Sequence, residues 1–157
     1  MKRLQIGCGQ IRHEGWTRLD ANPACSPDIL AAIPPLPQAV REQQWDEVEW
    51  IHGPNVLYPW DAARILAELR QVMAPEGTLA LEQPDIRMSV KAFSENEEHI
   101  AWIFGDPGYE DPLLMVRWGY TPEMLASAVA AAGFTRIRIV PARSHVPARD
   151  FRLEAQL

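Results

Sequence analysis

The residues best suited to chemistry lie near the N-terminus of the chain. Gly7 and Gly9 flank Cys8 directly after a short apolar run, residues 4–6. A glycine turn at such a place lets a ligand approach the backbone without meeting a Cβ atom. Asp20 ends the next apolar segment, where a carboxylate can accept hydrogen bonds from both hydroxyls of a ribose. Together the two features predict a nucleoside pocket.

The elements needed to position this pocket follow along the chain in the order of a parallel α/β sheet. Apolar runs predict five strands, at residues 4–6, 16–20, 29–33, 46–51 and 78–82. One apolar face, formed by Ile65, Leu66, Leu69 and Val72, predicts a helix over residues 60–73. A strand, a helix and a second strand joined by a short return are typical of parallel pairing.

The C-terminal part of the chain predicts one more helix and a hairpin. Thr121 is suited to the N-cap, Pro122 to the first helical position and Gly133 to the residue beyond the C-terminus. Apolar and polar residues then alternate over residues 134–140 and again over 151–157, as in half-buried strands. We expect these two strands to pair antiparallel at an edge of the sheet.

A long connection, residues 85–120, shows no strand pattern. Ser94 and Glu97 have the spacing of a capping box and predict a helix that starts there. Long insertions in compact domains are often functional lids, so we expect a lid-like segment. No repeat or domain boundary is visible, and residues 1–157 are expected to form a single domain.

Charge and composition narrow the function classes. The chain has 157 residues and a formal net charge of −6, which disfavours a basic face for nucleic acid phosphates. It contains neither the apolar segment of a signal peptide nor an apolar run long enough to span a membrane. We therefore expect a soluble, cytoplasmic protein that binds neither nucleic acid nor membrane.

The cysteines and histidines show no metal-binding pattern. Cys8 and Cys25 lack ligand spacing and a disulfide-rich context, which favours two free thiols. The four histidines are His13, His52, His99 and His145. They are scattered along the chain and interpreted as surface or hydrogen-bonded side chains, so no metal is expected.

Four segments of the chain resemble, in order, motifs of a known enzyme family. They are LQIGCGQIRHEGWTRLDANP, WDEVEWI, ILAELRQVMAPEGTLALEQPD and WGYTPEMLASAVAAAGFTRIRI. The family is that of the class I S-adenosylmethionine-dependent methyltransferases, here their small, methyltransferase type 11-like members. The resemblance implies a Rossmann-like α/β domain with a mostly parallel sheet, an antiparallel C-terminal edge hairpin, and S-adenosyl-L-methionine as cofactor.

The resemblance also implies where the cofactor would bind. The glycine turn would lie beside its methionine part, and Asp20 would hold the ribose. Ala32 and Ile33 would flank the adenine, and residues 55–56 would lie near the sulfonium. The implied cofactor-binding residues are Gly7, Cys8, Gly9, Asp20, Ala21, Ala32, Ile33, Asn55 and Val56.

Several positions depart from the family pattern. Gln5 and Ala32 stand where relatives have acidic residues, and Ile11 replaces the third glycine of the turn. Too few residues separate the turn from residue 16 for the usual first helix, which we expect to be shortened or absent. Residues 55–59, Asn-Val-Leu-Tyr-Pro, replace the His-Val-Leu-Glu-His of relatives. These departures remove polar contacts and leave one pocket wall open.

Methyl transfer from a sulfonium requires a positioned acceptor and, where the acceptor carries a proton, a general base. His99, Asp85 and Tyr120 lie in or at the ends of residues 85–120 and are the catalytic candidates, with Trp118 beside them.

The aromatic residues of the chain have two competing interpretations. Trp102, Phe104 and Tyr109 could line an acceptor pocket, but their helical spacing favours core packing. Trp45, Trp50 and Trp60 are expected to pack around the fourth strand and its helix.

Three functions remain to be distinguished. The first is an S-adenosylmethionine-dependent methyltransferase with a small-molecule or glycan-like acceptor. The second is a non-catalytic, methyltransferase-like binding or scaffold protein. A nicotinamide-dependent dehydrogenase fits less well, because the complete GxGxxG pattern is absent. The open pocket wall and the unassigned aromatic residues also suggest a homodimer.

Overall fold

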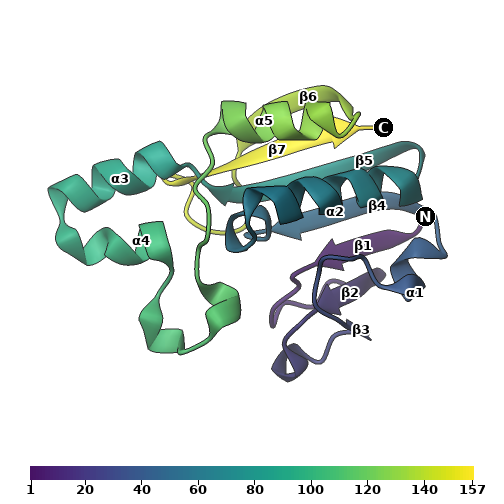
Figure 1. Ribbon diagram of the computed structural model, residues 1–157, viewed down its shortest axis with the longest axis horizontal. Coiled ribbons are helices and arrows are strands. Elements are labelled where there is room, and N and C mark those ends of the chain that lie inside the picture. The colour runs from purple at the N-terminus through teal and green to yellow at the C-terminus, as the bar shows by residue number, and fades with distance from the viewer.

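A seven-stranded sheet in the order β3-β2-β1-β4-β5-β7-β6 runs through the computed structural model, which describes all residues 1–157 (Figure 1). The strands are β1 (Arg3–Ile6), β2 (Trp16–Asp20), β3 (Ile29–Leu30), β4 (Trp45–Ile51), β5 (Met73–Pro84), β6 (Thr135–Pro141) and β7 (Asp150–Gln156). The first five strands pair in parallel, and β7 lies between β5 and β6 and is antiparallel to both. The predicted fold class, including the antiparallel C-terminal hairpin, is confirmed.

Five α-helices accompany the sheet, namely α1 (Gln38–Arg41), α2 (Pro59–Val72), α3 (Ile86–Glu95), α4 (Ala101–Phe104) and α5 (Pro122–Ala131). Figure 1 shows α2 and α5 side by side over the same face of the sheet. No helix lies between β1 and β2, as predicted from the short loop. None of the five helices has the length and apolar character of a membrane-spanning segment.

The boundaries of two strands differ from the predicted ones. Strand β3 has only two residues, because its ladder to β2 ends at Asp20, whose partner is Leu30. Strand β5 begins earlier than predicted, because α2 passes directly into it and Met73 already pairs with Trp45. The residues between the predicted helix and the predicted strand, 74–77, are instead part of β5, where its pairing with β4 is irregular and Glu76 has a φ of 63°.

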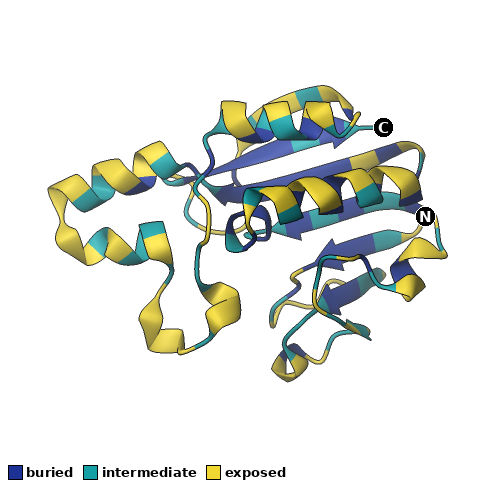
Figure 2. Ribbon diagram, in the orientation of Figure 1, coloured by how far each residue is buried: buried dark blue, intermediate teal, exposed yellow.

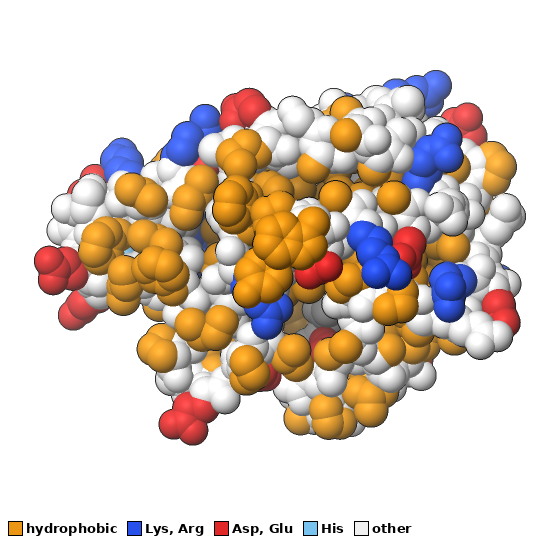
Figure 3. All heavy atoms as spheres, in the orientation of Figure 1, with side chains coloured by type: hydrophobic (Ala, Val, Ile, Leu, Met, Phe, Trp, Pro, Cys, Tyr) orange, Lys and Arg blue, Asp and Glu red, His pale blue; other side chains and the backbone are white.

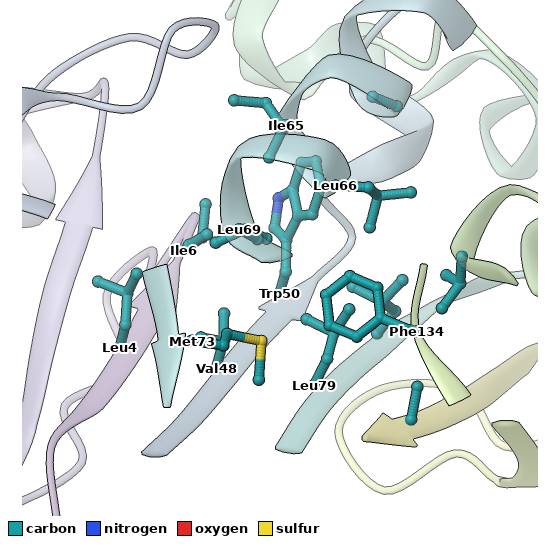
Figure 4. Packing of buried hydrophobic residues seen from close by; sticks show 14 of the residues in the cluster. Leu4, Ile6, Val48, Trp50, Ile65, Leu66, Leu69, Met73, Leu79 and Phe134 are labelled. Carbon is teal, nitrogen blue, oxygen red and sulfur yellow. The ribbon is translucent and has the colours of Figure 1, made fainter. Parts of the chain in front are cut away.

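The hydrophobic core lies between α2, α5 and one face of the sheet. Figure 4 shows the Trp50 side chain from β4 reaching under α2, near Ile65, Leu66 and Leu69. All four side chains are at most 1% exposed. Each such side chain stabilises the fold by about 1.5–3 kcal/mol through burial of apolar surface. The periodicity that predicted α2 therefore corresponds to the face buried here.

The opposite face of the sheet carries charged side chains instead of helices. Arg152 of β7 contacts Glu49 of β4 at 2.9 Å and Glu82 of β5 at 3.4 Å, and Arg3 of β1 contacts Glu47 of β4 at 3.0 Å. Parallel sheets are usually buried on both faces and have continuous apolar strands. Here each strand alternates, because the connections β1–β2 and β2–β3 provide no α-helix to cover this face.

The connection between β5 and α5 forms a lobe beside the sheet, made of residues 85–120 (Figure 1). Figure 2 shows that this lobe is largely exposed, and Ser89 is the one buried residue of α3. The predicted capping box is wrong. Asp85 caps α3 by accepting a hydrogen bond from the Arg87 amide, and Ser94 lies in the last turn of that helix.

Candidate cofactor cavity and a histidine–aspartate pair

A cavity of about 860 Å³ opens at the carboxyl ends of β1, β2 and β4. This is the edge of a parallel sheet at which ligands bind in α/β folds. All nine residues that the sequence predicted for cofactor binding line it, namely Gly7, Cys8, Gly9, Asp20, Ala21, Ala32, Ile33, Asn55 and Val56. The structure thus brings together positions from four separate loops.

The glycine turn leaves free space on its cavity side. Gly7 and Gly9 have φ values of 64° and 54°, which disfavour side chains. A Cβ atom on Gly9 would meet no atom within 4 Å, and one on Gly7 would meet only the Ile51 carbonyl oxygen, at 3.9 Å. The backbone therefore forms a cradle that a ligand can approach closely.

Asp20 holds this turn from the end of β2. One carboxylate oxygen accepts a hydrogen bond from the Gly9 amide at 2.9 Å, and the other accepts one from the Asn22 amide at 2.8 Å. A carboxylate has about four acceptor positions, so each oxygen can accept one further hydrogen bond. Asp20 can therefore support the turn and still bind hydroxyl groups in the cavity.

Arg18 is a buried residue that sequence reasoning missed. Its guanidinium donates hydrogen bonds to the carbonyl oxygens of Gly9 at 3.0 Å, Cys25 at 2.9 Å and Ser26 at 2.9 Å. These bonds tie the glycine turn, which lies in the helix-free connection between β1 and β2, to the loop that follows β2. The sequence gives no clear signal for it, because the strand is already partly polar, with Thr17 before Arg18 and Asp20 after it.

Both cysteines lie in the cavity lining, close to this arginine. Cys8 and Cys25 are free, as predicted, and both are buried. Burial raises the pKa of each thiol above its ordinary value, so both are protonated at neutral pH.

Two amide side chains in the cavity wall each have a buried oxygen without a hydrogen-bond partner. The Gln5 Oε1 and Asn55 Oδ1 atoms are buried and have no hydrogen-bond partner in the protein. Leaving a buried polar atom unpaired costs about 1–3 kcal/mol. A ligand that donates hydrogen bonds would relieve that cost at both positions.

The lobe forms one wall of the cavity. Its lining residues include Trp102, Tyr109 and Val116. The backbone amides of Arg117 and Trp118 both donate to the Asn55 carbonyl oxygen, at 2.8 and 3.1 Å. The segment predicted to be lid-like therefore lies against the loop after β4.

A histidine and an aspartate meet at the same cavity. His52 directly follows β4, and its Nε2 atom lies 2.7 Å from Oδ2 of Asp150, the first residue of β7. The ring of His145 stacks on that of His52, with centroids 4.0 Å apart. Arg149 donates hydrogen bonds to both oxygens of Asp150. Both histidines and Arg149 line the cavity.

Burial and neighbouring groups shift the pKa values of Asp150 and His145. Burial of Asp150 opposes its ionisation, but hydrogen bonds from His52 and Arg149 outweigh burial and hold its pKa below the ordinary value. The pKa of His145 is lowered by desolvation of its covered side and by the neighbouring His52. At neutral pH the aspartate is thus ionised and His145 is uncharged.

The same three side chains satisfy the spacing of a metal site, although the sequence shows no metal motif. Ligand atoms of His52, His145 and Asp150 all lie within 4.8 Å of one another. The guanidinium of Arg149, however, already donates to both Asp150 oxygens. A cation would have to replace or repel this positive charge, so the arrangement favours a hydrogen-bonded pair.

The catalytic candidates taken from the sequence lie outside the cavity lining. Asp85 caps α3 and forms an ion pair with Arg87 at 2.8 Å. Tyr120 is 5% exposed and belongs to the hydrophobic core. His99 packs against Trp102, with ring centroids 4.5 Å apart. The structure gives the first two residues roles in holding the lobe and the core.

The aromatic residues correct two expectations. Trp45 and Trp50 are buried beside β4, as expected, but Trp60 is 67% exposed and stacks on Tyr58. Core packing is also the wrong interpretation for the lobe, where Trp102 and Tyr109 line the cavity and Phe104 is exposed. Trp118, 43% exposed, borders a small hollow beside Asn55. The buried residues of the 85–120 segment are Asp85, Ser89 and Tyr120, so none of these tryptophans and neither Phe104 nor Tyr109 is among them.

Solved structures of methyltransferases share this architecture. An S-adenosylmethionine-dependent methyltransferase from Archaeoglobus fulgidus is 15% identical with a TM-score of 0.69, and 99% of this chain and 86% of that chain are covered. One from Methanosarcina mazei is 16% identical with a TM-score of 0.68, over 99% and 91% of the two chains. The glycopeptide N-methyltransferase MtfA, solved with S-adenosylhomocysteine, is 13% identical with a TM-score of 0.67, over 99% and 82%.

No family model matches the chain, and no curated protein matches it. The similarity in structure nevertheless spans almost the full length of the chain. The chain therefore has the fold of the class I S-adenosylmethionine-dependent methyltransferases, as its sequence motifs suggested.

Proposed function

We propose that this protein is an S-adenosylmethionine-dependent methyltransferase that acts on a small-molecule or glycan-like acceptor. The observation that carries the proposal is the convergence of all nine implied cofactor-binding residues on one cavity. When bound there, the cofactor would supply an electrophilic methyl group on its sulfonium. The fold, shared with known methyltransferases, supports the same assignment.

The residues present fit this cofactor. The cradle at Gly7 and Gly9 admits a group at van der Waals distance from the backbone, and Asp20 retains acceptor positions for ribose hydroxyls. The unpaired oxygens of Gln5 and Asn55 complement the hydrogen-bond donors that the ammonium group and hydroxyls of the cofactor provide. Ala32 and Ile33 would give the adenine an apolar contact.

A non-catalytic binding or scaffold protein is the second candidate. The specific observation in its favour is that the side chains of Ala32 and Ile33 offer the adenine no polar contact, and Gln5 replaces the acidic residue of relatives. Such a protein would bind the cofactor or its demethylated product and transfer nothing. Turnover that disappears with Asp20→Ala would eliminate this candidate.

Calorimetric titration with S-adenosylmethionine and S-adenosylhomocysteine tests the proposed site. We expect micromolar binding to the wild type and a loss of about 10- to 100-fold in Asp20→Ala, the effect of losing one or more charge-assisted hydrogen bonds. Glu14→Ala is the matched control, because it removes one negative charge from an exposed residue outside the cavity lining. Absence of binding to the wild type would refute the proposal.

A further inference from the structure

The histidine–aspartate pair and the glycine turn border the same cavity from different strands. The ladder of β1 and β4 ends with Ile6 paired with Trp50, so the loops that carry Gly7 and His52 leave the sheet at the same edge. The 3.9 Å approach between a Cβ on Gly7 and the Ile51 carbonyl oxygen agrees with this register. His52 therefore shares one cavity with Gly7 and Cys8. The His52 side chain reaches Asp150 of β7, on the far side of β5.

We propose that His52 is the general base of this site, that Asp150 is its positioning residue, and that the acceptor is a hydroxyl compound. The inference rests on the proposed function and adds to it a base and an acceptor class. It replaces the sequence candidate His99, which lies outside the cavity lining.

The hydrogen bond to Asp150 leaves the other ring nitrogen of His52 basic. An ionised carboxylate only accepts hydrogen bonds, so His52 Nε2 must carry the proton that it donates across 2.7 Å. In that tautomer Nδ1 holds a lone pair, and it forms no hydrogen bond in the protein. A base held in one tautomer by a carboxylate is the arrangement that general base catalysis requires.

The groups around the pair are themselves paired or uncharged. Asp150 and Arg149 neutralise each other, and the stacked His145 is uncharged at neutral pH. Behind them, Arg152 bridges the carboxylates of Glu49 and Glu82. The Glu82 carboxylate also accepts hydrogen bonds from the backbone amides of residues 143 and 144.

The transfer step balances with these residues alone. As the acceptor oxygen forms its bond to the methyl carbon, the carbon–sulfur bond breaks and its electron pair passes to the sulfur, giving the thioether product. The hydroxyl proton passes to His52 Nδ1, and the imidazolium so formed is stabilised by Asp150. The proton leaves to solvent after the products dissociate.

A base at the cavity fits a hydroxyl acceptor, whose proton must leave as its oxygen attacks the methyl group. The walls contributed by Trp102, Tyr109 and Val116 suit an apolar or aromatic body that carries the hydroxyl.

A pair of phenols tests the base directly, with radiolabelled S-adenosylmethionine as methyl donor. At pH 8 the hydroxyl of 4-methylphenol is protonated, like that of tyrosine, whose pKa is about 10. The hydroxyl of 4-nitrophenol is ionised at that pH. We expect His52→Gln to lower the transfer rate to 4-methylphenol about 100- to 10,000-fold while transfer to 4-nitrophenol changes little.

A nuclear magnetic resonance measurement tests the pair without turnover. Long-range nitrogen–proton spectra of the wild type should show the Nε2–H tautomer for His52. In Asp150→Asn the side-chain amide can donate to Nε2, so the proton should move to Nδ1. Asp150→Glu keeps a carboxylate and should restore the Nε2–H tautomer.

The outcomes separate this inference from the proposed function. Loss of S-adenosylhomocysteine binding in the wild type would refute the function itself, whereas binding in His52→Gln at wild-type affinity shows that the cofactor site persists. Any of three results would overturn the role of His52 as general base. They are equal rate losses for both phenols, no transfer to either phenol by a wild type that binds cofactor, or an unchanged tautomer in Asp150→Asn. Micromolar binding of Zn²⁺ that requires His52, His145 and Asp150 would overturn it as well.

Discussion

At the scale of single residues, the site depends on a buried cation that binds only carbonyl groups. Arg18 is 5% exposed, and its guanidinium has no carboxylate partner within hydrogen-bond distance. Its three carbonyl contacts lie on the two loops that enclose the cavity. The residue thus links the helix-free connection after β1 to the loop after β2.

Arg18→Met should therefore destabilise the protein by about 2–4 kcal/mol, because several buried carbonyl oxygens lose their donors. Urea unfolding measures the change. Arg138→Met is the control, since the Arg138 side chain is 73% exposed and the same substitution there should cost little. Equal stability of the two variants would show that Arg18 does not hold the loops.

Sequence reasoning predicted residues that line one cavity, but it did not predict the histidine–aspartate pair. Gly7, Gly9 and Asp20 lie within 14 positions of one another, so local spacing predicts their convergence. His52 and Asp150 are separated by 98 positions and meet only because β5 brings β4 and β7 near each other. No local pattern signals a contact of that kind.

At the scale of elements, the turn after β4 is the tightest point of the site. Gly53 begins the 3-10 helix that carries Asn55, and a Cβ atom on it would lie 1.4 Å from Nε1 and 1.9 Å from Cδ1 of Trp50. Trp50 is 1% exposed and packs under α2 (Figure 4), so its ring has no free space to move into. The turn and the core are therefore directly coupled.

Gly53→Ala should destabilise the protein by about 1–3 kcal/mol or more through overpacking, and should weaken S-adenosylhomocysteine binding by displacing Asn55. Thermal unfolding and calorimetry measure the two effects. Gly108→Ala is the comparison, because its Cβ atom would meet only the Asp106 side chain, at 3.0 Å on the exposed lobe. A Gly53→Ala protein as stable as Gly108→Ala would contradict the coupling.

Helices were predicted correctly from the sequence where a single capping residue or apolar face determines them. The cap at Thr121 and the apolar face of α2 were both confirmed. The helix start at Ser94 was wrong because Asp85, nine positions earlier, accepts the Arg87 amide and starts α3 first. Short polar side chains that can cap occur at several points of the lobe, and tertiary contacts decide which one is used.

At the scale of the whole molecule, the protein has a well-packed sheet and a thinly packed lobe. Helix α2 buries five residues, whereas α3 buries one and α4 none. Figure 2 shows the contrast between the dark strands and the largely exposed lobe. Local stability depends on buried apolar contacts, so the two parts should open at different free energies.

We expect amide hydrogens of α3 and α4 to exchange at least about 100-fold faster than those of α2. Hydrogen exchange followed by mass spectrometry measures the difference. S-adenosylhomocysteine should then slow exchange in the lobe residues that line the cavity, and leave α2 unchanged. Uniform exchange across the molecule would contradict this division.

Exposed hydrophobic side chains could form the interface of the homodimer that the sequence suggests. Figure 3 shows hydrophobic side chains gathered over the start of α2 and over the lobe. Among them, Tyr58 and Trp60 are 46% and 67% exposed and stack at 4.8 Å. We expect light scattering to give twice the chain mass of 17.7 kDa, and Trp60→Ala to give a monomer. A monomeric wild type at high concentration would remove the dimer.

The cavity at the carboxyl ends of β1, β2 and β4 is the proposed binding site of the methyltransferase cofactor. A backbone amide titration with S-adenosylhomocysteine, followed by nuclear magnetic resonance, tests it residue by residue. We expect saturable shifts at Gly7, Gly9, Asp20 and Asn55, with none along α5. Saturable shifts confined to another surface, or no shifts at millimolar ligand, would contradict it.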